Sequence, residues 1–394
     1  MYDFNEIIER RNTDSIKYDF AAQRGKPEGI LPLWVADMDF RTPPCVIEAL
    51  VQKSRHGIFG YSDSKEDYFL ALSNWFAEHF NWQIKKEWLV KTPGVVYALC
   101  TAIRSLTQKG DAIIIQQPVY YPFADSILSN ERKLVVNKLV YDQGRYSINF
   151  DDFEQKIIEN NVKLFILCSP HNPVGRVWTK DELIKLGDIC FKHGVIVIAD
   201  EIHADFTYPG HQHHVFTSLK PEFAQFTLTC TAPTKTFNLA GLQISNIFIP
   251  NRELRQKFRE EIAKSGYSQP NIMGLIACKA AYNEGYPWLR ELREYLLGNL
   301  NFLRDFLETR LPQVKLVEPE GTYLVWLDFQ ELGLDLNALE DLIVRRANLW
   351  LDAGTMFGAG GEGFQRINIA CPRAVLEKAL LQLEYAIKSY KFST

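Results

Sequence analysis

Three short apolar runs stand out in the middle of the chain, at residues 112–115, 164–167 and 195–198. Each is rich in isoleucine, leucine or valine and follows a polar or glycine-containing stretch. Uninterrupted apolar runs of this length are typical of strands that are covered on both faces, as in a parallel sheet.

Amphipathic stretches near these runs predict helices at residues 97–105, 123–129 and 180–192. The last helix is preceded by Thr179, and Glu182 follows three residues later, which is the spacing of a capping box. Strands that alternate with helices predict a doubly wound α/β domain.

The pattern changes after about residue 285. Amphipathic stretches predict helices at residues 288–310, 336–348 and 374–388, interleaved with strand-like segments at 322–328 and 365–370. We therefore expect a large domain at residues 48–285 and a smaller α+β domain at 286–394, which the N-terminal segment 1–47 joins.

The composition narrows the function classes. Of 394 residues, 46% are hydrophobic and 23% are charged, and 44 basic against 48 acidic side chains give a formal net charge of −4. This balance argues against nucleic acid as a partner. No apolar run reaches the roughly 20 residues that span a bilayer, and the N-terminus lacks a signal-peptide pattern, so no membrane partner is expected. The seven cysteines form no Cys-x-x-Cys pair, and we expect a cytoplasmic protein with reduced thiols.

Candidate site residues lie where the predicted strands end. Asp200 follows the third apolar run, Asn172 lies after the second, and Tyr120 and Tyr121 lie after the first. Ligands of open α/β sheets bind at the carboxyl ends of the strands. Gly94 also precedes a predicted helix, whose free N–H groups can bind a phosphate.

Lys235 is the only charged residue between residues 227 and 248. An ammonium in such a stretch is either desolvated and reactive or paired with a counterion. Asp200, directly after an apolar run, is expected to be partly buried and to need a cationic partner. A lysine that bonds to the cofactor aldehyde and a carboxylate that keeps the pyridine nitrogen protonated are the two groups that pyridoxal phosphate most needs. Together they predict a pyridoxal phosphate site.

Ordinary structural interpretations stand beside these. Either tyrosine could be a core aromatic instead of stacking on a cofactor, and Asn172 could be a turn residue, because Asn-Pro is a turn signal. Three histidines follow Pro-Gly in a polar loop and are interpreted as solvated, with no metal site: His211, His213 and His214. The glycine-rich segment 358–363 is interpreted as a flexible active-site loop, because no strand-then-helix frame surrounds it.

Seven motifs follow one another along the chain: Leu33-Trp-Val-Ala-Asp-Met-Asp-Phe40, Phe59-Gly-Tyr61, Pro118-Val-Tyr120, Ser169-Pro-His-Asn-Pro-Val-Gly-Arg-Val-Trp178, Asp200-Glu-Ile-His203, Ala232-Pro-Thr-Lys-Thr-Phe-Asn238 and Arg366-Ile-Asn-Ile-Ala-Cys-Pro-Arg373. With these motifs the whole chain resembles the fold type I pyridoxal phosphate enzymes of the class I/II aminotransferase superfamily. Within that superfamily it is most similar to the MalY/PatB group of carbon–sulfur lyases, which includes cystathionine β-lyases.

The resemblance implies a large, doubly wound, mostly parallel sheet domain with a smaller α+β domain, and it implies catalytic roles. Lys235 would bind the cofactor covalently and, once freed by substrate, act as the base at Cα. Asp200 would pair with the pyridine nitrogen, Tyr120 would stack on the ring, and Asn172 would contact the phenolate oxygen. Arg366 would clamp the substrate carboxylate with two hydrogen bonds, a geometry suited to guanidinium.

The resemblance also implies a phosphate site and a dimer. The amides of Val95 and Val96, with Thr234, would bind the phosphate. Tyr61 would reach that phosphate from the neighbouring subunit, so a homodimer with active sites at the interface is expected. Tyr61 and Asn172 would also border the substrate.

Three positions depart from the general aminotransferase pattern. Gln243 replaces an arginine that many aminotransferases place on the phosphate, and Ala232 replaces a serine, so the phosphate is less fully charge-compensated. His203 stands where a tyrosine often contacts the phenolate oxygen and would take that place near the cofactor. Whether Thr231 or Thr234 contacts the phosphate stays open.

We expect a β-lyase that cleaves cystathionine or a related cysteine S-conjugate to a thiol, pyruvate and ammonia. An aminotransferase is the first alternative, because it would share every cofactor contact. The preference for the lyase rests on the segment 34–40 and on Gln243, by resemblance. A regulatory protein that sequesters a transcription factor is the second alternative, and the sequence does not identify the sulfur amino acid.

Overall fold

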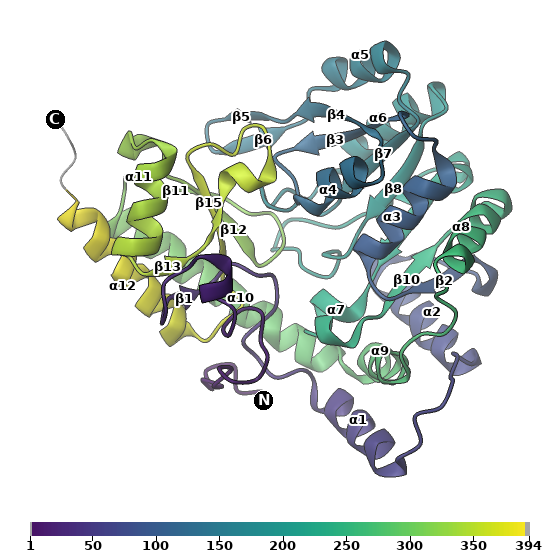
Figure 1. The fold of residues 1–394 in the computed structure, drawn as a ribbon, viewed down its shortest axis with the longest axis horizontal. Helices are drawn as coiled ribbons and strands as arrows, with labels where there is room; N and C mark the ends of the chain where they lie inside the picture. The colour runs from purple at the N-terminus through teal and green to yellow at the C-terminus, as the bar shows by residue number, and fades with distance from the viewer. Residues whose placement is uncertain (1, 391–394) are drawn as a thin grey trace.

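A seven-stranded sheet lies at the centre of the larger part of the molecule (Figure 1), as seen in a computed structural model that describes residues 2–390. Four of its six pairings are parallel, and β10 runs antiparallel to both of its neighbours. The strand order is β2 (Leu89–Thr92), β10 (Ser245–Phe248), β9 (Thr227–Thr231), β8 (Ile196–Asp200), β7 (Leu164–Cys168), β3 (Ala112–Gln117) and β4 (Lys133–Lys138).

Helices cover both faces of this sheet. One face packs against α3 (Val95–Leu106), α4 (Pro122–Ser129) and α8 (Arg252–Lys264). The other packs against α5 (Phe150–Asn160) and α6 (Lys180–Lys192). Every residue of β3 and β7 is buried, which explains the uninterrupted apolar runs at residues 112–115 and 164–167.

The predicted capping box at the start of α6 is confirmed. The Thr179 hydroxyl accepts a hydrogen bond from the Glu182 N–H (3.2 Å), and the Glu182 carboxylate accepts one from the Thr179 N–H (2.8 Å). Arg176, buried near the helix start, donates to the same carboxylate (3.0 Å). Polar capping therefore sets where α6 begins.

The C-terminal part is built on a four-stranded antiparallel sheet in the order β11 (Lys315–Val317), β12 (Leu324–Asp328), β15 (Phe364–Asn368) and β14 (Asp352–Ala353). Two long helices accompany it, α10 (Tyr286–Arg310) and α12 (Arg373–Ser389). The predicted helix at 336–348 is not one regular α-helix: α11 (Leu336–Glu340) continues into a π-helical turn, Asp341–Arg346.

The N-terminal segment runs beside this C-terminal part (Figure 1). Its strand β1 (Leu31–Pro32) pairs in parallel with β13 (Leu349–Trp350). The remaining α-helices are α1 (Pro44–His56), α2 (Glu66–Phe80), α7 (Pro233–Thr236) and α9 (Ile272–Glu284), and β5 (Val140–Asp142) and β6 (Arg145–Ser147) form a hairpin. The domain boundaries at residues 47 and 285 stay predictions.

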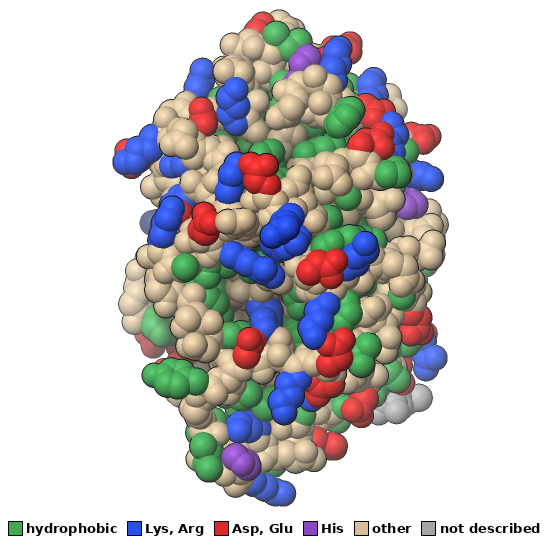
Figure 2. Space-filling view, turned by 90° about the vertical axis from the view of Figure 1, so that its right-hand side faces the viewer, with side chains coloured by type: hydrophobic (Ala, Val, Ile, Leu, Met, Phe, Trp, Pro, Cys, Tyr) green, Lys and Arg blue, Asp and Glu red, His purple; other side chains and the backbone are tan. Residues whose placement is uncertain are grey.

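Basic and acidic side chains are interspersed over the face of the molecule shown in Figure 2, in keeping with the nearly balanced composition. Within residues 2–390, no helix combines the length and the apolar character that crossing a membrane would require.

Candidate active site

The predicted site residues converge where the central strands end. Asp200 is the last residue of β8 and pairs in register with the last residue of β7, a few residues before Asn172. Because β9 lies beside β8, the short helix α7 that follows β9 brings Lys235 to the same edge of the sheet. This edge is where α/β sheets bind ligands.

Asp200 is a buried acid, with 5% of its surface exposed. Burial raises the pKa of its carboxyl to about 7; nearby Glu201 acts in the same direction, whereas a hydrogen bond from the Ile202 N–H (3.2 Å) and the charge of Lys235 oppose the shift. A carboxylate held in this way gains from a cation placed against it. A protonated pyridine nitrogen fits that requirement.

Lys235 is held by the backbone of a distant segment. Its Nζ donates to the carbonyl oxygen of Ala36 (2.8 Å), and the Tyr323 hydroxyl donates to the same oxygen (3.0 Å). Burial lowers the pKa of Lys235 to about 8; Arg366 acts in the same direction, and Asp37 and Asp200 oppose it. A large share of this amine is therefore neutral near pH 8, as a nucleophile or a proton acceptor must be.

This shift predicts a distinctive modification profile. In the cofactor-free protein, an amine-reactive acetylating reagent should modify Lys235 with a half-maximal rate near pH 8, because only the neutral amine reacts. An ordinary lysine has a pKa of about 10.4, so its neutral fraction at pH 8 is roughly 100-fold smaller. Mass spectrometry after brief labelling between pH 6 and pH 10 measures the extent of acetylation of Lys235 and of the other lysines at each pH. Labelling of Lys235 that rises only above pH 9 would contradict the prediction.

Arg366, on β15, is already partly engaged. Its Nη1 donates to the Asn172 side-chain oxygen (3.0 Å), and its Nη2 donates to the Trp34 carbonyl (2.8 Å) and forms a buried ion pair with Asp352. Its Nε is buried and has no hydrogen-bond partner among the described residues. The structure thus brings Arg366 and Asn172 into direct contact and leaves the Nε–H of the guanidinium unsatisfied.

Tyr120 lies beside these groups. Its N–H donates to the Asn172 carbonyl (3.0 Å), which joins the loops after β3 and β7. Burial raises the pKa of the Tyr120 hydroxyl; Asp200 acts in the same direction, and Arg366 opposes it. The half-buried Tyr120 ring is therefore within electrostatic reach of both the acid and the guanidinium.

The candidate phosphate site lies at the start of α3. That helix begins at Val95, no side chain among the described residues caps it, and the next residue, Val96, is 38% exposed. Thr231 donates its hydroxyl to the Asn246 carbonyl inside the sheet (2.8 Å), whereas Thr234 is half-buried. This contact favours Thr234 as the phosphate ligand.

His203 is buried at 4% exposure, and its ring centroid lies 5.9 Å from that of Tyr323. Burial lowers its pKa to about 3, and the charges of Lys235 and Arg366 act in the same direction. His203 Nδ1 is buried and lacks a hydrogen-bond partner within residues 2–390. A neutral imidazole in this position can hydrogen-bond a ligand without adding charge.

Two further residues depart from the aminotransferase pattern, Ala232 and Gln243. Ala232 is buried directly after β9, and Gln243 is exposed with a left-handed backbone (φ 50°). The glycine-rich loop at 358–363 packs against the loop after β3, where the Ala359 N–H donates to the Gln117 side chain (3.0 Å).

The interpretation of the three loop histidines as solvated is wrong for one of them. His213 is buried, and its Nε2 lies 3.0 Å from the Glu201 carboxylate, which is equally buried. His211 is exposed and His214 is half-buried. The buried acid next to Asp200 therefore has its own partner, which proximity in sequence did not reveal. Within the described residues, no group of three histidine, cysteine, aspartate or glutamate side chains is placed to hold a metal ion.

Tyr61 is not brought to this site by its own chain. It lies between α1 and α2 and is 97% exposed, beside the exposed side chains of Ile58 (67%) and Phe59 (58%).

One part of the site, residues 33–40, had no predicted contact with the other site residues; we call it the N-terminal strap. The carbonyl groups of Ala36 and Trp34 accept hydrogen bonds from Lys235 and Arg366, as described above. In addition, the side chain of Asn368 donates to the carbonyl groups of residues 35 and 37, and that of Asn238 donates to those of residues 38 and 40. Its motif was visible in the sequence, but these contacts are with residues about 200 to 330 positions away.

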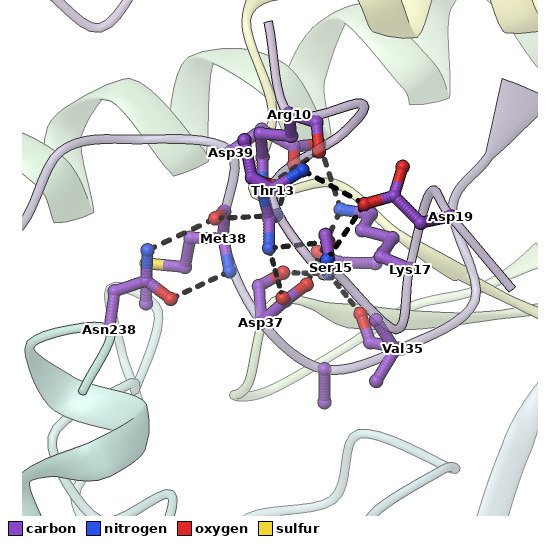
Figure 3. Close-up of polar contacts among 12 residues, drawn as sticks. Arg10, Thr13, Ser15, Lys17, Asp19, Val35, Asp37, Met38, Asp39 and Asn238 are labelled. Atoms are coloured by element: carbon purple, nitrogen blue, oxygen red, sulfur yellow. Dashed lines mark hydrogen bonds and ion pairs between the residues drawn. The ribbon is translucent and has the colours of Figure 1, made fainter. Parts of the chain in front are cut away.

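A charged cluster fixes the strap from the other side (Figure 3). Arg10 contacts Asp37 (2.6 Å) and Asp39 (2.6 Å), and the fully buried Lys17 contacts Asp39 (2.8 Å). Ion pairing of this kind offsets the free-energy cost of removing the charged groups from water. Asp37 belongs both to this cluster and to the electrostatic surroundings of Lys235.

Comparisons with known proteins agree with this geometry. Cystathionine beta-lyase PatB of Bacillus subtilis is 42% identical over 98% of this chain and 99% of its own length. Protein MalY of Escherichia coli is 35% identical over 99% of this chain and 100% of its own. The solved structure of cystalysin from Treponema denticola, which contains a pyridoxal 5'-phosphate cofactor, matches with a TM-score of 0.96 and 39% identity over 99% of this chain and 100% of that chain.

A family model described as aminotransferase class I and II matches residues 28–383. The predicted fold class is confirmed by the mixed central sheet and by the match to cystalysin. The predicted kinship with PatB and MalY is likewise confirmed. The chain belongs to the class I and II aminotransferase family.

Proposed function

We propose that this protein is a pyridoxal-phosphate-dependent carbon–sulfur β-lyase. Its substrate is an amino acid with sulfur on Cβ, and cystathionine is the first candidate because PatB, its relative over nearly the whole chain, is named a cystathionine beta-lyase. The products from cystathionine are homocysteine, pyruvate and ammonia.

The observation that carries the cofactor assignment is the buried acid Asp200 within electrostatic reach of Lys235, an amine with a pKa of about 8. Lys235 would bind the cofactor aldehyde, Asp200 the pyridine nitrogen, and Tyr120 the ring face. Asn172 and His203 are the candidates for the phenolate oxygen. The phosphate would lie at the Val95 and Val96 N–H groups, with Thr234.

When bound, pyridoxal phosphate supplies a sink for the electrons released at Cα. The chain's own residues do the rest. Arg366 binds and orients the substrate carboxylate, and Asn172 holds the guanidinium in place. The Asp200 carboxylate would stabilise a positive charge on the pyridine nitrogen of the cofactor. Lys235 Nζ, held near the Ala36 carbonyl, takes the proton from Cα.

The reaction is an elimination. The proton leaves Cα for Lys235, the electron pair of that C–H bond forms the Cα–Cβ double bond, and the Cβ–S bond breaks. Its electron pair departs with the sulfur, which takes up a proton from the Lys235 ammonium and is released as a thiol. The remaining aminoacrylate takes up water and yields pyruvate and ammonia. An aminotransferase would instead leave the Cβ–S bond intact and pass the amino group to a 2-oxo acid.

Assay of the purified holoenzyme with L-cystathionine tests this proposal. Pyruvate and free thiol should form in equal amounts without any added 2-oxo acid. Amino transfer that requires a 2-oxo acid and releases no pyruvate would overturn the lyase assignment in favour of an aminotransferase.

The proposal includes a homodimer with shared active sites. Support comes from the exposed segment of Ile58, Phe59 and Tyr61, because large apolar side chains gathered on a surface mark an interaction site. In a symmetric dimer, each Tyr61 would serve the partner's phosphate site. A cytoplasmic location also fits the seven free cysteines, and fractionation of cells would test it.

Shared sites predict complementation between inactive subunits. Tyr61→Ala and Lys235→Ala should each be nearly inactive alone, but their co-expressed mixture should recover up to about a quarter of wild-type activity. Half of randomly formed dimers are mixed, and one of their two sites is intact. Lys235→Ala mixed with Asp200→Asn is the matched control, since both residues serve the same subunit's site. Equal recovery in both mixtures, or none in the first, would contradict the shared site.

A further inference from the structure

A cavity adjoins the Arg366 site. It has a volume of about 390 Å³ and lies between the N-terminal segment and the C-terminal sheet. Its wall includes Arg24, Trp34, Trp350 and Asp352. The backbone carbonyl of Trp34 and the carboxylate of Asp352 both accept hydrogen bonds from Arg366, so the cavity and the candidate carboxylate clamp share a wall.

Four charged side chains line this cavity, and three of them have an ion-pair partner. Lys26 is paired with Glu340, and Asp352 is paired with Arg366. Arg24 forms no ion pair with any residue in the described range 2–390; its guanidinium lies 5.2 Å from the ring centroid of Trp34. One positive charge is therefore left over and available to an anion.

Trp34 adds a second unsatisfied group. Its side chain is buried, stacked on Trp350 with ring centroids 4.4 Å apart and planes at 11°. Its indole Nε1 has no hydrogen-bond partner within residues 2–390. Buried indole N–H groups ordinarily have a hydrogen-bond acceptor. We therefore take the unpaired Trp34 N–H as an indication that a ligand supplies the acceptor oxygen.

Arg24 also lies close to the reaction site. Burial raises the pKa of the Tyr121 hydroxyl; Asp352 acts in the same direction, and Arg366 and Arg24 oppose it. Arg24 is thus within electrostatic reach of the residue next to Tyr120. An anion at Arg24 would be near, but distinct from, the carboxylate held by Arg366.

We propose that Arg24 and the Trp34 indole bind a second carboxylate of the substrate, on the far side of the sulfur from the reacting carbon. The enzyme then prefers cysteine thioethers that carry a distal carboxylate over those with a neutral alkyl group. This inference rests on the proposed lyase function and identifies the substrate class within it. A guanidinium–carboxylate contact is a strong recognition element because both partners are charged.

Two thioether substrates test the proposal in the holoenzyme. L-Cystathionine carries the distal carboxylate, and S-ethyl-L-cysteine presents the same Cβ–S bond without it. Arg24→Met keeps an apolar stem over Trp34 and removes the charge. It should lower kcat/KM for cystathionine about 10- to 100-fold and leave kcat/KM for S-ethyl-L-cysteine unchanged.

The double variant Lys26→Met/Glu340→Gln is the matched control, since it removes a cancelling pair from the same cavity. It should leave the ratio of the two kcat/KM values as in the wild type. Equal effects of Arg24→Met on both substrates, or none on cystathionine, would overturn the distal carboxylate site. A wild-type enzyme that cleaves neither substrate would instead overturn the proposed lyase function.

Discussion

Lys235→Ala should reduce pyruvate formation by about 10³-fold or more, because the variant loses both the covalent anchor of the cofactor and the base at Cα. The pKa of about 8 means that Lys235 can give up its proton near neutral pH and accept one during turnover. The measurement is the rate of pyruvate release with saturating pyridoxal phosphate, together with the visible absorbance of the protein, which the variant should lose.

Two further measurements separate a chemical role from a structural one. Lys109→Ala changes an exposed lysine paired with Glu131 and should leave the rate unaltered. A small primary amine added to Lys235→Ala should restore part of the lost rate, since it can replace the missing base, and should not stimulate the wild type. A Lys235→Ala enzyme that keeps wild-type turnover would remove the lysine from the mechanism.

Asp200→Asn should lower lyase turnover about 10²- to 10³-fold while preserving the shape of the side chain. An amide cannot hold a positive charge at the pyridine nitrogen, so the electron sink weakens. Steady-state kinetics should show the loss mainly in kcat, because the residue does not face the substrate carboxylate. Retention of wild-type kcat would contradict the assignment of Asp200.

The same variant should change the pH dependence of stability in the cofactor-free protein. The carboxyl pKa is raised to about 7 in the folded state, against about 3.9 unfolded, so the folded state binds the extra proton between these values. Stability from this group is therefore lost as the pH rises from about 4 to 7, by at most about 4 kcal/mol.

Urea unfolding at pH 5 and pH 8 measures this effect. The wild type should lose more stability over that interval than Asp200→Asn, whereas Asp188→Asn, at an exposed site paired with Lys220, should behave like the wild type. Identical pH dependence in the wild type and in Asp200→Asn would show that Asp200 is not desolvated.

Local sequence patterns were sufficient for much of the large domain. The runs at 112–115 and 164–167 became strands β3 and β7, and the polar signal at Thr179 and Glu182 marked the start of α6. Patterns failed where hydrogen bonding or burial depended on the surroundings. The segment 336–348 turned π-helical at Asp341–Arg346, and His213 was buried against Glu201.

The chain's order of residues was enough to place Asp200 and Asn172 at strand ends and to mark Lys235 as a lone charge, because parallel strands present their carboxyl ends at one edge. It could not determine that the Ala36 carbonyl holds Lys235 or that Trp34 and Asp352 hold Arg366. Those contacts join segments far apart in sequence, and the shifted pKa values follow from the desolvation that such packing creates. Only the folded chain brings these groups together, so only the tertiary structure decides their chemistry.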